Sequence, residues 1–226
     1  MARKLRWQFL QDMAVALPVI PEIDLPVNAC FAVMAIEGLF LILLQFDTKH
    51  ISLFAARKLC HSGSGLSMLF LTSHLLVNRL YIYGVVALSL TMTWSLIPGI
   101  PNWRFGAYED PGITIYLLIV GFWYFMELPI AVLAPVFFAD PAGAVVGQWA
   151  SRNIPNLNPK WIGTKTVLGS VAVFVVAFVT LHAPATFLPR LMVAFVTAVV
   201  EGFGGKYDNL NIAAVVIIAW FLNAHN

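Results

Sequence analysis

The chain has 226 residues, of which 60% are hydrophobic and only 11% are charged, and its mean hydropathy is +0.84. Soluble globular domains carry about 25% charged residues, so this composition excludes ordinary soluble, disordered, collagen-like and coiled-coil proteins and predicts an integral membrane protein. The net charge of +2 comes from scattered residues, which argues against nucleic-acid binding. The two cysteines are too few for a disulfide framework.

The N-terminal segment, residues 1–24, is predicted to lie in the membrane interface. It combines basic residues such as Arg3 and Lys4 with apolar side chains such as Trp7, which suit the headgroup region. Residues 25–226 are predicted to form a single transmembrane domain.

This domain is predicted to be an all-α, polytopic bundle of transmembrane helices. The apolar runs are continuous and do not alternate as the strands of a membrane barrel would. A full span needs about 20 apolar residues, and we expect about six to eight membrane segments, including broken or half helices. The runs are Leu25–Phe46, Ser62–Asn78, Leu80–Trp103, Gly112–Ala139, Thr166–Pro189, Arg190–Val200 and Asn209–Asn226.

The hydrophilic residues are concentrated between these runs, in residues 47–61, 101–111, 140–165 and 201–209. A break at Glu127-Leu128-Pro129 would let Gly112–Ala139 cross the membrane twice, as broken helices beside a protein cavity can. That topology brings the hydrophilic segments to one face. Because most of the Lys and Arg residues then lie on this face, the positive-inside rule places it in the cytosol.

The first candidate site is the basic cluster Arg57-Lys58-Leu59-Cys60-His61. On a helix, Arg57 and His61 are one turn apart and share a face. Arg offers a bidentate fork and Lys a point charge, so the cluster could hold phosphate oxygens. A basic flank beside anionic lipid headgroups is the alternative.

The second candidate is Asp140, within Ala139-Asp140-Pro141-Ala142-Gly143. Asp followed by Pro is typical of a helix start, with Asp140 as the N-cap. A carboxylate beside so apolar a stretch is costly and also indicates a ligand for Mg²⁺. Gly143 and Gly147 form a pair of small residues that favours close helix packing.

The third candidate runs from Gly163 to Ser170 and enters a charge-free run. Its glycines, its hydroxyl groups and Lys165 would form an anion site at a helix N-terminus. The order of residues is not that of a Walker A loop.

The fourth candidate is the segment from Glu201 to Asn209, in which two carboxylates and an amide flank three glycines. A polar turn explains the glycines but explains less well why Glu201 and Asp208 lie at the ends of apolar runs. Either carboxylate could bind Mg²⁺ or act as a base for a substrate hydroxyl. Glu37 and Glu127 are also acids in apolar runs, and each could serve only as an interhelical hydrogen-bond partner.

Taken together, these motifs resemble the CTP-dependent lipid-alcohol kinases, which act on phytol, farnesol, dolichol or diacylglycerol, and the pattern is most similar to the phytol kinases. The resemblance covers residues 55–215. The matching elements, in order, are Arg57-Lys58-x-x-His61, Asp110-Pro111-Gly112 leading to Tyr116, Asp140-x-Ala142 with Gly147, Lys165-Thr166-x-x-Gly169-Ser170, and Glu201 with Asp208-Asn209.

The resemblance implies transfer of a phosphoryl group from a nucleotide, CTP by analogy, to the hydroxyl of a lipid alcohol. It implies that Asp140 and Asp208 hold Mg²⁺ and that these two residues, Lys165 and Glu201 are catalytic. It also implies that the remaining motif residues bind the nucleotide or its phosphates. These are Arg57, Lys58, His61, Gly147, Thr166, Gly169, Ser170 and Asn209. The chain departs from the family pattern at Pro141, Gln148, Leu168 and Tyr207.

Two other functions are compatible with the sequence. Cytidylyl transfer to a phosphorylated lipid is related chemistry, although the basic, Asp-rich signature of that activity is not evident near the C-terminus. Acids within apolar runs would also suit a transporter or a membrane scaffold, but no inverted repeat is visible.

Overall fold

The computed structural model describes residues 22–223, and within them the all-α architecture is confirmed. The prediction for the N-terminal segment falls largely on residues 1–21, which lie outside the described residues. The α-helices are α2 (Val27–Phe46), α3 (Leu53–Met68), α4 (Leu76–Trp94), α5 (Pro111–Phe125), α6 (Ala134–Asn153), α7 (Val167–Thr180), α8 (Phe187–Gly204) and α9 (Asp208–Asn223). Short 3₁₀ helices lie at η1 (Ile130–Leu133), η2 (Pro155–Leu157) and η3 (Gly205–Tyr207), and strands β1 (Lys160–Ile162) and β2 (Lys165–Thr166) form one antiparallel hairpin.

The helices have the length and composition of a membrane protein. Four helical stretches are long and apolar enough to cross a bilayer: Val27–Phe46, Leu76–Trp94, Ile130–Asn153 and Phe187–Asn223, the last of which comprises the two helices α8 and α9 joined by η3. Helices α5 and α7 are shorter apolar helices. Large apolar side chains such as Leu39 on α2 and Phe195 on α8 lie exposed on the outside of the bundle, where lipid rather than water would cover them.

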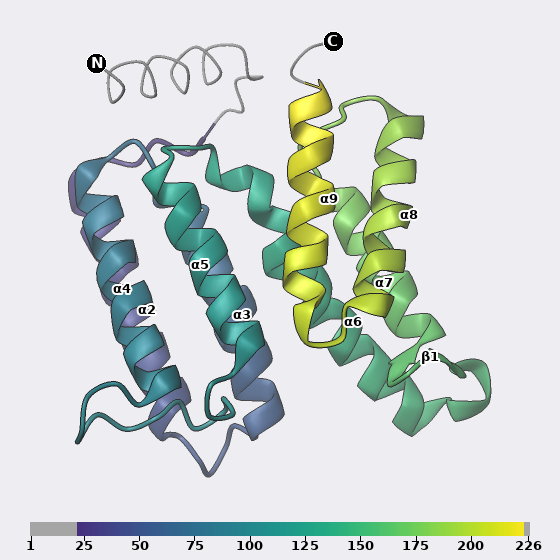
Figure 1. Cartoon of the computed structure of the whole chain (residues 1–226), viewed down its shortest axis with the longest axis horizontal. Helices are drawn as coiled ribbons and strands as arrows, with labels where there is room; N and C mark the ends of the chain where they lie inside the picture. Colours follow the sequence, from purple (N-terminus) through teal and green to yellow (C-terminus); the bar gives the residue numbers. More distant parts are fainter. Residues whose placement is uncertain (1–21, 224–226) are drawn as a thin grey trace.

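The bundle consists of two groups of helices (Figure 1). One group contains α2 to α5, and the other contains α6 to α9, in which α8 and α9 form an antiparallel hairpin. Helix α3 packs against α6, and α5 packs against α9, so these four helices join the two groups. The loops after α2, α4 and α6 and the turn between α8 and α9 lie at the same end of the bundle, the lower end in Figure 1, as the predicted topology requires.

Close approach of α6 and α7 depends on three glycines. A Cβ atom at Gly143 would lie 3.1 Å from the carbonyl oxygen of Gly169, and one at Gly147 would lie 3.5 Å from the Gly169 Cα. These two helices make the most extensive helix–helix contact in the described chain. The small-residue pair Gly143 and Gly147 therefore packs helices together, as its spacing predicted.

The prediction that Asp140 caps a helix is wrong. Helix α6 already begins at Ala134, with Pro135 in its first turn, and Asp140 and Pro141 lie in its interior. The earlier proline lies in the first turn, where its missing N–H leaves no intrahelical hydrogen bond unmade, whereas Pro141 has no N–H to donate to the carbonyl of Phe137. Asp140 is therefore a buried carboxylate on the side of a helix.

Several predicted boundaries also differ from the structure. Helix α3 begins after Ser52, whose hydroxyl accepts a hydrogen bond from the Ala55 N–H at 3.2 Å, so the cluster at Arg57 is helical and Ser62–Asn78 is not one span. The run Leu80–Trp103 is helical only as far as Trp94. The predicted break before Pro129 is present, between α5 and η1.

Candidate functional site

Three carboxylates from three different helices meet where the two groups of helices join. Asp140 comes from α6, Glu201 from the end of α8 and Asp208 from the start of α9. One oxygen of each lies within 4.8 Å of the others. Asp140 and Glu201 are buried, at 5% and 2% exposure, and Asp208 is half-buried. We refer to these three residues as the carboxylate cluster.

Two lysines neutralise part of this negative charge. The Lys58 ammonium donates a hydrogen bond to Asp140 Oδ2 at 2.7 Å. Lys165 donates to Glu201 and also to Asp208 Oδ2, which lies 3.3 Å away. Burial favours the neutral form of Lys165, but the Glu201 and Asp208 carboxylates outweigh this effect and raise the pKa of Lys165 above its ordinary value.

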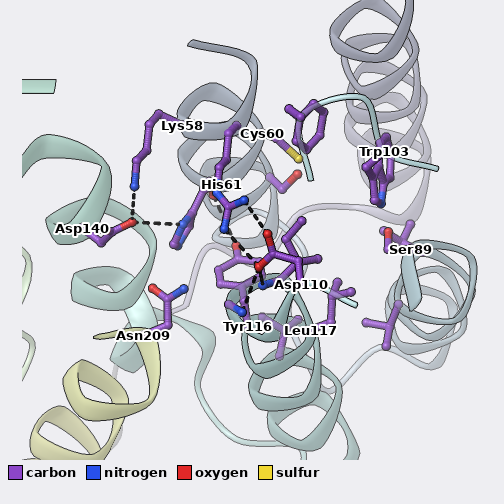
Figure 2. A pocket seen from close by; sticks show the side chains of 18 of the residues that line it. Lys58, Cys60, His61, Ser89, Trp103, Asp110, Tyr116, Leu117, Asp140 and Asn209 are labelled. Carbon is purple, nitrogen blue, oxygen red and sulfur yellow. Dashed lines mark hydrogen bonds and ion pairs between the residues drawn. The ribbon is translucent and has the colours of Figure 1, made fainter. Parts of the chain in front are cut away.

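His61 is held beside the cluster in one orientation. Its Nε2 lies 2.9 Å from the Val136 carbonyl oxygen, and because a carbonyl can only accept, Nε2 carries the proton. Its Nδ1 then faces Asp140 Oδ2 at 3.7 Å, as Figure 2 shows. The ring packs edge-on against Tyr116, with ring centroids 4.4 Å apart.

Arg57 forms a separate ion pair with Asp110. The two guanidinium nitrogens lie 2.6 and 3.1 Å from the two Asp110 oxygens. Asp110 also caps α5 by accepting from the N–H groups of Gly112 and Ile113. Burial opposes ionisation of Asp110, but Arg57 and these N–H donors outweigh it and lower the pKa of this carboxyl.

This ion pair means that Arg57 already has a carboxylate partner outside the cluster, unlike Lys58. Asp110 belongs to one of the motifs on which the family resemblance depends, but no role in the site was predicted for it. The Asp-Pro pair before an apolar run was the signal for its capping role.

A polar cavity of about 650 Å³ opens on one side of the carboxylate cluster. The predicted residues Gly147, Thr166, Gly169 and Ser170 line it together with Lys165. Thr164, from the third candidate segment, also lines it, as do basic and polar residues without a predicted role, namely Arg152, Lys160, Gln148 and Ser151. We refer to this space as the polar compartment.

The predicted anion site at the start of α7 is partly occupied by the protein itself. The Thr166 hydroxyl accepts from the Gly169 N–H at 3.4 Å and so caps the helix. The Ser170 hydroxyl accepts from the Trp161 indole N–H at 2.9 Å. Lysine and arginine side chains thus supply the charge of the polar compartment, with the hydroxyls of Thr166 and Ser170 engaged in local structure.

A second cavity, of about 390 Å³, extends from the other side of the cluster into the first group of helices. Most of its wall is apolar and comes from α3, α4 and α5, with Met68, Ile82, Val86, Leu117 and Val120 among the lining residues. We refer to it as the apolar compartment. Lys58, Asp140, Gly205 and Asp208 line both compartments, so the cluster lies at their junction.

Asn209 marks the point where the apolar compartment meets the cluster. Its side chain lies near Asp140 in Figure 2, lines the apolar compartment and is 7% exposed. Its buried Oδ1 has no hydrogen-bond partner among residues 22–223. Such an orphaned acceptor is costly unless a ligand donates to it.

The departures from the family pattern leave the cluster intact. Tyr207 is largely exposed, and its ring lies 5.2 Å from the Lys206 ammonium. Glu201, rather than a residue at position 207, is the third carboxylate. Gln148 lines the polar compartment, where its neutral amide replaces the charge that an arginine would supply.

The carboxylate cluster has the donors of a divalent cation site. Mg²⁺ prefers oxygen ligands and is commonly bound by one or two carboxylates together with substrate phosphates. Asp140, Glu201 and Asp208 supply such oxygens within a small space. Comparison of the chain with known protein families, with curated proteins and with solved structures finds no match.

Proposed function

We propose that this chain is a multi-pass membrane kinase that transfers a phosphoryl group from a nucleoside triphosphate to the hydroxyl of a lipid alcohol. The observation that carries the proposal is the position of the carboxylate cluster between a basic, polar compartment and an apolar one. A charged nucleotide fits the first environment and a lipid tail fits the second. The resemblance to the phytol kinases supports CTP as the nucleotide and a phytol-like alcohol as the acceptor.

The basic residues of the polar compartment have the chemistry to bind the triphosphate. Lys160 and Arg152 line its wall, while Lys165 and Lys58 lie at the carboxylates. On nucleotide binding, the two ammonium groups at the carboxylates would turn to the phosphate oxygens, and Asp140 and Asp208 would hold Mg²⁺. The bound ion supplies charge neutralisation on the phosphates.

The transfer itself requires in-line attack by the lipid hydroxyl. A bond forms between the hydroxyl oxygen and the γ-phosphorus, and the bond from that phosphorus to the β–γ bridging oxygen breaks. The nucleoside diphosphate leaves with that oxygen. Before transfer, the incoming hydroxyl would donate its one hydrogen bond to Asn209 Oδ1, which has no partner among residues 22–223. During transfer, Glu201 or Asp208 would accept that proton instead and release it to solvent. Lys58 and Lys165 stabilise the charge on the transferred group.

A direct assay tests the proposal. Purified protein in lipid nanodiscs is incubated with Mg²⁺, each of CTP, ATP, UTP and GTP in turn, and phytol, farnesol, dolichol or diacylglycerol. The expected product is the lipid monophosphate with release of nucleoside diphosphate. Release of pyrophosphate with a CDP-lipid would indicate cytidylyl transfer instead, and the absence of any modified lipid would overturn the proposal.

A further inference from the structure

Two acids that line the apolar compartment have no role in the proposed phosphoryl transfer: Asp110, which pairs with Arg57, and Glu37, which lies deeper in the first group of helices. Glu37 lies in the middle of α2, is 1% exposed and lines this compartment. It belongs to the first group of helices, whereas Asp140 and Asp208 belong to the second. A carboxyl group within such an apolar helix is costly and commonly marks a binding site.

The protein only partly satisfies this carboxyl group. The Tyr81 hydroxyl lies 3.2 Å from Glu37 Oε2 and also 3.2 Å from the Met34 carbonyl oxygen. Its single proton can be donated to one of them at a time. Ser64 also interacts with the Glu37 carboxyl group. A carboxylate can accept about four hydrogen bonds, which is more than Tyr81 and Ser64 can donate to Glu37.

Other polar side chains line the same compartment. Cys60 and Ser64 are one helical turn apart on α3, and Ser89 comes from α4; all three line the compartment. Figure 2 shows Cys60 and Ser89 well separated from Asp140 and Asn209. A simple hydrocarbon tail would offer these polar side chains no hydrogen bond, which is unfavourable in an apolar cavity.

We infer that the acceptor is a lipid alcohol with a second hydrogen-bond donor, a hydroxyl or an ammonium group, which Glu37 binds away from the reacting hydroxyl. This inference rests on the proposed function for the reacting end and narrows its substrate class. Asn209 at the cluster and Glu37 in the apolar compartment then bind the lipid at two points, which fixes its position along the compartment. Diols and amino alcohols share the required chemistry.

The test compares three lipids of equal chain length: a saturated primary alcohol, the matching diol and the matching amino alcohol. We measure binding without nucleotide, as lipid-dependent thermal stabilisation in detergent, and kcat/KM with nucleotide. At least one of the two bifunctional lipids should bind and react about tenfold better than the plain alcohol, the ratio expected for one hydrogen bond to a charged group. Equal binding of all three by the native protein would overturn the inference, whatever its kinase activity.

Variants then assign the effect to Glu37. In Glu37→Gln, preference for the amino alcohol should disappear, because the amide has no charge to pair with ammonium, while the diol keeps part of its advantage. Glu127→Gln is the matched control, since Glu127 pairs with Arg79 and is absent from the compartment lining. An unchanged preference in Glu37→Gln would exclude Glu37 as the anchor. Selective binding without lipid phosphate formation would instead contradict the proposed function and leave the binding site in place.

Discussion

Replacing Asp140 with Asn separates a metal-binding role from a purely structural one. The change is nearly isosteric, so the α6 backbone and the contact with α7 should persist. It removes the charge that faces the Lys58 ammonium at 2.7 Å, in a pair whose side chains are 16% and 7% exposed. The loss of a hydrogen bond between charged groups costs about 1.5–3 kcal/mol of folding free energy.

The effect of Asp140→Asn on turnover should be larger than its effect on folding. If Asp140 holds Mg²⁺ against the phosphates, we expect turnover to fall by about a hundredfold or more, which corresponds to about 2.7 kcal/mol of transition-state stabilisation. The assay is single-turnover formation of lipid phosphate by protein reconstituted in nanodiscs, with thermal unfolding measured on the same sample.

The double variant Lys58→Met/Asp140→Asn tests the structural explanation. If Asp140 only balances Lys58, removing both charges should restore much of the stability and of the turnover together. Our proposal predicts partial recovery of stability with no recovery of turnover, because residues that act as one catalytic unit are non-additive. Near-normal turnover by Asp140→Asn in correctly folded protein would refute the metal-binding role.

Three further changes test other parts of the structure. Lys165→Met should raise KM for the nucleotide by about tenfold or more with membrane insertion unchanged, because an ammonium–phosphate contact is lost; nucleotide titration measures this, and an unchanged KM would exclude the contact. Asp110→Asn should keep the α5 cap, because Asn caps as well as Asp, but should cost about 1 kcal/mol through loss of the Arg57 pair. The folded-state pKa of Asp110 is lowered. Ionised Asp110 therefore stabilises the folded state fully above the ordinary Asp pKa of about 3.9, and this stabilisation is lost as the pH falls through the folded-state pKa. The difference in stability between the native protein and Asp110→Asn should therefore disappear in acid. A difference that stays constant with pH would contradict the ion pair of Asp110 with Arg57. Gly143→Ala should lower stability by about 1–3 kcal/mol, because its Cβ would lie 2.4 Å from a side-chain carbon on α7, whereas Gly84→Ala on α4, with no atom within 4 Å, should be neutral or stabilising in the same thermal unfolding measurement.

Several features of the fold could be predicted because they depend on local composition. The apolar run at α2, the break before Pro129 and the start of α9 at Asp208 all follow from hydropathy and turn residues. The number of membrane crossings before a motif decides at which end of the bundle that motif lies. The break at Pro129 adds one crossing and so brings the later motifs to the same end as the earlier ones.

The interior position of Asp140 was harder to predict, because two prolines compete for the first turn of one helix. Pro135 occupies that turn in the structure, so Pro141 and Asp140 fall inside α6. Sequence patterns of helix starts cannot rank these two prolines, since the choice depends on where α6 meets α3, α7 and α9.

The partners of the charged residues depend on tertiary packing. Arg57 and Lys58 are adjacent, yet one pairs with Asp110 before α5 and the other with Asp140 on α6, because they point in directions about 100° apart on their helix. For Glu37, the sequence likewise indicated only that an acid within an apolar run is costly. The cavity beside it is lined by α2, α3, α4 and α5 together with residues of α6 and α9, so it depends on tertiary packing.

The most direct test of the central claim is a dual-label transfer experiment. Reconstituted protein, Mg²⁺ and a lipid alcohol are incubated with a nucleotide that carries one phosphorus label at the α position and a different one at the γ position. We predict that the extracted lipid contains the γ label alone, and that Asp140→Asn and Asp208→Asn each abolish its incorporation. Lipid that carries the α label, or lipid without either label for every nucleotide and alcohol tested, would contradict phosphoryl transfer at the carboxylate cluster.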